Sequence, residues 1–79
     1  MAARPKGVQN KIDKIGANIE KAIKEAGYTS IYDFWVNNPK SVAKSTLHDI
    51  VAGKSDPKVS TLILLAESLK INLSDLTKV

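Results

Sequence analysis

The chain has 79 residues, of which 43% are apolar and none is cysteine, so we expect one small domain without disulfides or thiolate metal sites. No apolar run approaches the ~18 residues needed to span a bilayer, and the first residues lack the apolar centre of a signal peptide, which together predict a soluble, cytoplasmic protein. Lys and Arg outnumber Asp and Glu by 12 to 8, and the resulting net charge of +4 favours a polyanionic partner.

Residues 1–10 are predicted to form a flexible basic arm ahead of a helical domain over 11–79. The arm contains Pro5 and Gly7 and shows no apolar periodicity. Four cations against one acid give the first fourteen residues a net charge of +3, whereas the rest of the chain is almost balanced. Such an arm suits contact with nucleic acid as well as plain solvation.

A first helix follows the arm, because apolar residues recur there with a period near 3.6. Gly27 is placed to end this helix. Gly16 lies inside it at a cost of about 1 kcal/mol relative to Ala, so we expect another backbone to pack closely there. The apolar stripe consists of Ile12, Ile15, Ile19, Ala22, Ile23 and Ala26.

A second helix is predicted to begin at a Thr29 or Ser30 cap and to stop at Asn37-Asn38-Pro39. Its large side chains, Phe34 and Trp35, are interpreted as packing in the core or at its edge and not as a platform for stacked bases.

The stretch V-A-K-S-T-L-H-D-I-V-A-G, residues 42–53, predicts a third helix. Leu47, Ile50 and Val51 repeat at helical spacing and can pack inward. The opposite face carries only side chains that form hydrogen bonds, and Ser41 is available as a cap. The major groove of DNA admits one such helix and displays donors and acceptors on each base pair.

A fourth and a fifth helix complete the chain. Lys54-Ser55-Asp56-Pro57 predicts the turn before the fourth helix, and Asn72 with Asp75 forms a capping-box variant that opens a short fifth helix ending at Leu76. The expected inward face of the fourth helix comprises Val59, Leu62, Ile63, Leu65, Ala66 and Leu69.

From Ile15 to Leu76 the chain resembles the lambda-repressor-like (Cro/repressor, XRE-type) helix-turn-helix family. The similarity is carried by I-G-A-N-I-E-K-A-I-K-E-A-G-Y-T, by V-A-K-S-T-L-H-D-I-V-A-G-K-S-D-P and by V-S-T-L-I-L-L-A-E-S-L-K-I-N-L-S-D-L. The resemblance implies an all-α, compact bundle of five short helices that contains a helix-turn-helix. It also implies a sequence-specific regulator of transcription in a prokaryotic or phage setting, such as a small repressor or controller protein, that binds double-stranded DNA.

The resemblance makes the helix at about 43–52 the recognition helix, with base-reading residues in its first turns. We expect the base-reading residues to be Lys44, Ser45, Thr46 and Asp49, which offer donors and acceptors that suit base edges. Phosphate contacts are expected from residues at two helix starts and in one turn, namely Thr29, Ser30, His48, Lys54, Ser55 and Lys58.

A homodimer is also expected, because an extra apolar patch near the C-terminal end would gain from being covered. Its candidate interface residues are Leu64, Ile71, Leu73, Leu76 and Val79. A protein-interaction or antitoxin-like module on the same scaffold is the alternative function, and RNA binding is a third. No phosphate loop, nucleophile elbow or carboxylate cluster occurs in the sequence, so we expect neither an enzyme nor a cofactor, metal or small-molecule ligand.

Overall fold

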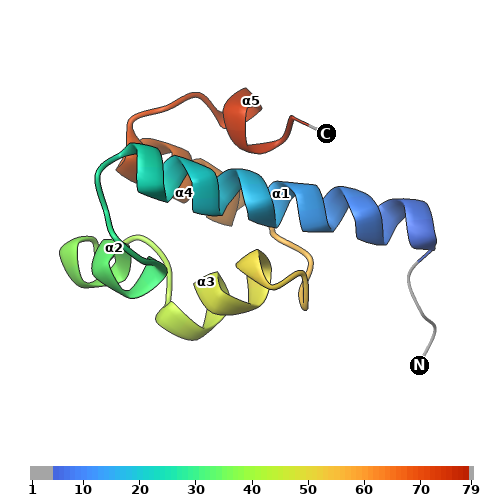
Figure 1. Ribbon diagram of the computed structural model, residues 1–79, viewed down its shortest axis with the longest axis horizontal. Helices are drawn as coiled ribbons and strands as arrows, with labels where there is room; N and C mark the ends of the chain where they lie inside the picture. Colours follow the sequence, from blue (N-terminus) through green and yellow to red (C-terminus); the bar gives the residue numbers. More distant parts are fainter. Residues whose placement is uncertain (1–4, 79) are drawn as a thin grey trace.

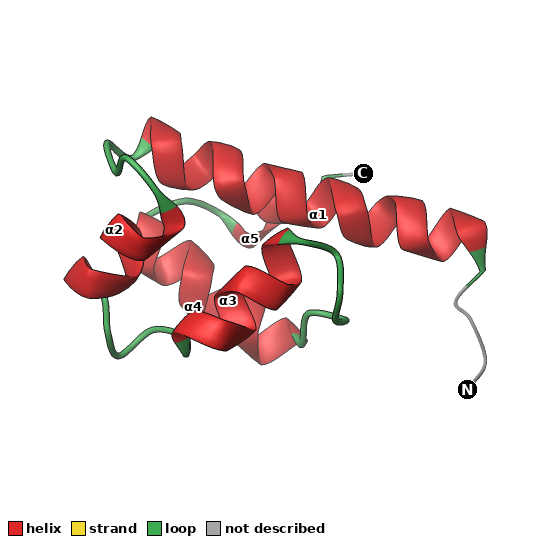
Figure 2. Cartoon of the chain, turned by 60° about the horizontal axis from the view of Figure 1, so that its bottom comes forward, coloured by secondary structure: helices red, strands yellow, loops and turns green. Residues whose placement is uncertain are grey.

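The computed structural model describes residues 5–78 and contains five helices, with no strand among those residues. α1 runs along the molecule, with α2 and α3 on one side of it and α5 on the other (Figure 1). Figure 2 gives the same chain from below, with α3 in front of α4. The all-α class is therefore confirmed. The helices are α1 (Lys6–Glu25), α2 (Ile31–Asn37), α3 (Lys44–Val51), α4 (Val59–Leu69) and α5 (Leu73–Leu76).

One apolar core joins all of these helices. Every helix supplies at least one side chain that is almost completely buried, and no polar or charged side chain is buried within the described residues. The largest buried side chains are Ile19 and Ile23 of α1, Phe34 of α2, Leu47 and Ile50 of α3, Leu65 of α4 and Leu76 of α5.

Local signals in the sequence fix several helix ends as expected. Ser30 caps α2, because its Oγ accepts the Asp33 backbone N–H at 3.0 Å. Asn72 and Asp75 form the predicted capping box at α5. Gly27 adopts φ 101° just after α1, and the Tyr28 N–H donates to the carbonyl of Ile23 at 3.2 Å, which satisfies a carbonyl at the helix end.

α1 begins earlier than the sequence indicated. Residues 6–10, assigned above to a flexible arm, are helical, so α1 has 20 residues and is not short. Pro5 precedes the helix, where proline is tolerated. Gln9 then secures the first turns, since its Nε2 donates to Asp13 Oδ1 at 2.8 Å and to the carbonyl of Gly53 at 3.0 Å. The first part of the predicted arm, residues 1–4, lies outside the described residues.

α4 also differs from its predicted face. Leu62, Leu65, Ala66 and Leu69 are buried as expected, but the side chain of Val59 is 65% exposed and that of Ile63 is 41% exposed. The helix is apolar on more than one side, so periodicity alone could not identify which side meets the core. Within residues 5–78, none of the helices combines the length and apolar character needed to cross a membrane.

Candidate nucleic-acid interface

α3 exposes a polar face because its apolar residues pack into the core on the opposite face. Leu47 and Ile50 are buried, and Val51 is half-buried. The carbonyls of Ile50 and Val51 lie so close to Gly16 of α1 that a Cβ at Gly16 would be 2.7 and 2.8 Å from their oxygens. The close backbone packing predicted at Gly16 is therefore confirmed, and its partner is the last turn of α3.

The exposed side of α3 holds the residues predicted to read bases. All five polar side chains in the helix are exposed, namely Lys44, Ser45, Thr46, His48 and Asp49. Helical spacing places Ser45 and Asp49 one turn apart on the outermost line of the face, with exposed Ala52 next to them. Sequence reasoning overlooked Ala52, which offers only a methyl group.

Thr46 lies on one flank of this face and not at its centre. It borders a hollow together with Ile50, Ser55 and Lys58. Thr46 is therefore grouped with two residues predicted to contact phosphate, Ser55 and Lys58. Lys54 lies three residues after the end of α3 and is exposed.

The turn that carries Lys54 is fixed by the end of α3. Gly53 adopts φ 75°, and the Lys54 backbone N–H donates to the carbonyl of Asp49 at 2.9 Å. A left-handed backbone conformation of this kind favours glycine. The Gly53 carbonyl also receives the Gln9 side chain, so α1 holds this turn in place.

The opposite flank of α3 faces the start of α2. His48 borders a hollow with Thr29, Ser30 and Tyr32, so the structure brings together three of the predicted phosphate-contacting residues. Thr29, however, directs both its N–H and its hydroxyl at Asp33 Oδ2, at 2.9 and 3.4 Å. The Asp33 carboxylate thus occupies the donors that a phosphate would need, and it repels a phosphate at that point. Thr29 therefore supports the start of α2 beside the Ser30 cap.

Ser41 does not cap α3 as the sequence suggested. Its Oγ donates to the carbonyl of Asn38 at 2.7 Å and so closes the turn after α2. Asn38 in turn donates to Tyr28 Oη at 3.1 Å and to the carbonyl of Phe34 at 3.0 Å. The residue before α3 is Ala43, so no side chain caps that helix.

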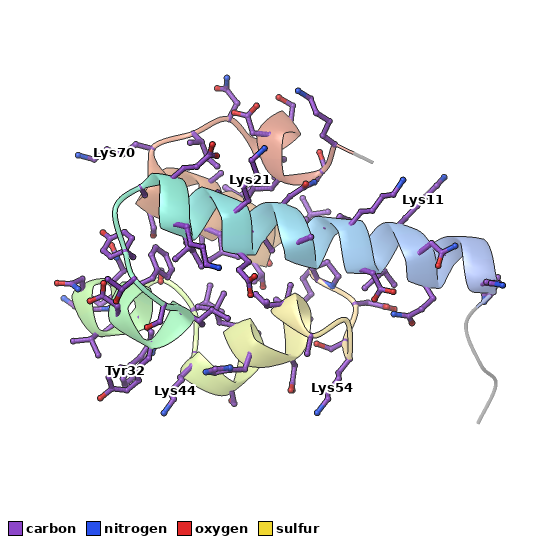
Figure 3. All side chains as sticks on the ribbon, in the orientation of Figure 1. Lys11, Lys21, Tyr32, Lys44, Lys54 and Lys70 are labelled. Atoms are coloured by element: carbon purple, nitrogen blue, oxygen red, sulfur yellow. The ribbon has the colours of Figure 1, made fainter. Side chains whose placement is uncertain are left out.

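Lys44 has aromatic neighbours that the sequence did not reveal. Its Nζ lies 4.9 Å from the ring centroid of Tyr32 and 6.0 Å from that of Trp35, both in α2. Phe34 is completely buried and Trp35 is half-buried, as predicted for residues in the core or at its edge, whereas Tyr32 is 54% exposed. In Figure 3, Tyr32, Lys44 and Lys54 lie along one edge of the molecule, and Lys11, Lys21 and Lys70 lie on the other side of α1.

The predicted dimer interface survives only in part. Leu64 is 44% exposed, and Ile71 and Leu73 are half-buried against the core. Leu76 is completely buried within the single chain, so it offers no surface to a partner, and its assignment to the interface is wrong. The assignment of Val79 falls outside the described residues.

No metal centre is formed by the described part of the chain, since no group of three or more His, Asp or Glu side chains comes together there. Comparison of the chain with models of protein families, with curated proteins and with solved structures returns no match. The function proposed below therefore rests on the residues and the geometry of this chain.

Proposed function

We propose that the protein is a sequence-specific, double-stranded DNA-binding regulator of transcription that inserts α3 into the major groove. The observation that carries this proposal is the outward face of α3, on which every polar side chain is exposed while Leu47 and Ile50 are buried. A single α-helix has the width that the major groove accepts, and the exposed face of α3 carries groups that can form hydrogen bonds there. In this proposal α2, the following turn and α3 form a helix-turn-helix of the lambda-repressor-like kind.

The side chains on the outer line of α3 suit base edges. Ser45 can donate or accept, and Asp49 can accept from the amino group of cytosine. Lys44, at the edge nearest α2, can donate to the O6 and N7 atoms of guanine. These three residues, one cationic, one neutral and one anionic, can therefore specify a short sequence of base pairs.

The flanks of α3 suit the sugar-phosphate backbone. Lys54 and Lys58 are exposed in the segment between α3 and α4, and Lys58 shares a hollow with Ser55 and Thr46. Lysines beside a recognition helix attract phosphate without reading sequence. They also fix how deep α3 enters the groove.

In-vitro selection from random duplex DNA tests the proposal and yields the preferred site. On that site we expect Lys44→Ala to cost about 1–3 kcal/mol of binding free energy and to relax one base position. Lys21→Ala is the matched control, since Lys21 is exposed on the other side of α1 (Figure 3). A selected pool without a consensus, or equal losses for the two variants, would contradict sequence-specific reading by α3.

Lys58→Ala separates backbone contact from base reading. We expect it to weaken all duplexes equally and to lower the slope of log affinity against log salt by about one unit. Lys70→Ala serves as the control, because Lys70 ends α4 away from α3 (Figure 3). A loss confined to the selected sequence would instead assign Lys58 to base reading.

The functional unit is further proposed to be a homodimer that places two copies of α3 on half-sites about one helical turn, ~34 Å, apart. Exposed Leu64 supports this arrangement, and Val59 and Ile63 are further exposed apolar residues of α4. Leu64→Glu should convert a sedimenting dimer to a monomer. A wild-type chain that is monomeric at all concentrations and binds one asymmetric half-site would exclude the dimer.

The exposed apolar residues of α4 also favour the second candidate, a protein-interaction or antitoxin-like module. This function predicts weak or absent DNA specificity and binding to a protein partner that Leu64→Glu abolishes. Lys44→Ala should leave such binding intact. Competition between a duplex and an RNA hairpin in the same assay decides whether RNA is the nucleic acid that the protein prefers.

A further inference from the structure

Tyr32 is a large aromatic residue in the first turn of α2, yet more than half of its side chain, 54%, is exposed. Tyr32 is not a core residue, and Phe34 is the residue of α2 that is completely buried in the core. Its ring lies beside that of half-buried Trp35, with 6.0 Å between the centroids and a tilt of 44°. Trp35 therefore lies beside the Tyr32 ring, and much of the Tyr32 side chain stays accessible.

Lys44, the first residue of α3, reaches this aromatic pair from the neighbouring helix. Its ammonium nitrogen lies 4.9 Å from the Tyr32 centroid, within the range of a cation–π interaction, and 6.0 Å from the Trp35 centroid. The first turn of α3 contains no acidic residue that would attract the ammonium instead. In Figure 3 the Lys44 side chain still points outward along the same edge as Tyr32. The ammonium is held on one side and exposed on the other.

This arrangement addresses a weakness of lysine as a base-reading residue. A lysine side chain is long and flexible, and its ammonium is a point charge without the fixed fork of arginine. An unsupported lysine can shift between a base and a nearby phosphate, and so reads sequence poorly. An aromatic face that holds the ammonium restricts it to one position relative to α3 and lowers the entropy lost on binding.

We propose that Tyr32 is a specificity-determining positioning residue, whose ring holds the Lys44 ammonium where it reads a single guanine. The inference rests on the proposed function, because it concerns how Lys44 meets DNA. The ring carries this role and the phenol hydroxyl does not. Tyr32 is neutral, so its loss leaves the electrostatic attraction to DNA unchanged.

The experiment uses Tyr32→Leu, with Tyr32→Phe as the matched control that keeps the ring. Affinities are measured for the selected duplex and for the same duplex with the guanine read by Lys44 replaced. We expect Tyr32→Leu to reduce discrimination at this base pair by about two- to fivefold, the range of an exposed cation–π contact. Tyr32→Phe should keep the full discrimination, and the salt slope should be unchanged in both variants. In a Lys44→Ala background, Tyr32→Leu should have no further effect at this base pair.

A second measurement follows the contact in the protein without DNA. The rings shift the NMR signals of the Lys44 methylene protons upfield, and this shift should be reduced in Tyr32→Leu and kept in Tyr32→Phe. Because Tyr32 is exposed, both variants should fold, and their melting temperatures check this.

The possible failures can be told apart. Absence of sequence-specific DNA binding by the wild-type chain removes the proposed function and the inference with it. Specific binding whose discrimination survives Tyr32→Leu, or tightens because the ring had kept the ammonium from the base, overturns the inference alone. An equal loss in Tyr32→Phe would assign the effect to the hydroxyl and would likewise overturn the role of the ring.

Discussion

At its C-terminal end α3 is packed against α1, whereas its N-terminal end has no side-chain cap. The last turn of α3 packs its carbonyls against Gly16, and Gln9 binds the carbonyl of Gly53 just beyond it. The first turn follows Ala43, which provides no side-chain cap, and the described contacts of Lys44 are with two aromatic rings.

The difference between the two ends fits the proposed function. A recognition helix has to be rigid relative to the rest of the domain, and α1 supplies that rigidity at the last turn of α3, next to Asp49 and away from Lys44 and Ser45. The first backbone N–H groups of any helix lack partners inside the helix. In α3 these N–H groups lie in the same turn as Lys44, Ser45 and Thr46, which are proposed to contact DNA. Changes at the last turn of α3 are therefore expected to alter mainly stability, whereas changes at its first turn are expected to alter DNA binding as well.

The largest effect is expected where α3 meets α1. In Gly16→Ala the new Cβ would lie 2.7 Å from the carbonyl oxygen of Ile50, so α3 must move outward. We expect a loss of about 1–3 kcal/mol in the free energy of unfolding, as for other overpacked sites. Urea denaturation measures this loss.

Gly7→Ala is the control for Gly16→Ala. Gly7 lies in the same helix, and a Cβ there meets nothing within 4 Å. This change should stabilise the protein by about 0.5–1 kcal/mol, because alanine is the better helix former. If Gly16→Ala stabilises the chain as much as Gly7→Ala does, α1 and α3 do not pack as closely as described.

A smaller effect is expected from Gln9, which joins the start of α1 to the turn after α3. Gln9→Ala removes the hydrogen bond to the Gly53 carbonyl and should cost about 0.5–1.5 kcal/mol. Amide exchange should then accelerate in residues 6–10. Replacement of the exposed neighbour Asn10 by Ala should not reproduce either change, and equal behaviour of the two variants would mean that Gln9 does not hold the helix start.

The sequence predicted most features that depend on nearby residues. The five helices, the caps at Ser30 and Asn72, and the role of Gly27 follow from patterns a few residues long. Gly16 could also be interpreted, because a glycine inside a helix requires a reason such as close packing.

Features that depend on distant contacts were not predictable in this way. Pro5 and Gly7 suggested a flexible arm, because the contact from Gln9 to Gly53 that secures the helix start spans 44 residues. The exposure of Val59 and the burial of Leu76 depend on where α4 and α5 lie against the core. The approach of Lys44 to Tyr32 likewise depends on how α2 meets α3, which no short pattern in the sequence specifies.

The effect with the smallest expected magnitude concerns the uncapped start of α3. Ala43 has φ −61° and ψ 143°, an extended conformation compatible with an N-cap residue, but it lacks an oxygen to accept an N–H group. Ala43→Ser adds that oxygen and should raise the free energy of unfolding by about 0.5–1 kcal/mol. Thermal denaturation should then show a melting temperature a few degrees higher.

Ala43→Asp separates stability from binding at the same position. A carboxylate caps a helix as well as a hydroxyl does and also interacts favourably with the helix dipole, so both variants should be stabilised. Only the carboxylate repels phosphate, so Ala43→Asp should bind duplex DNA more weakly than Ala43→Ser, with the difference shrinking as salt is raised. Equal affinities for the two variants would mean that the start of α3 lies away from the DNA, and the proposed docking of this helix would then be wrong even though the fold remained as described.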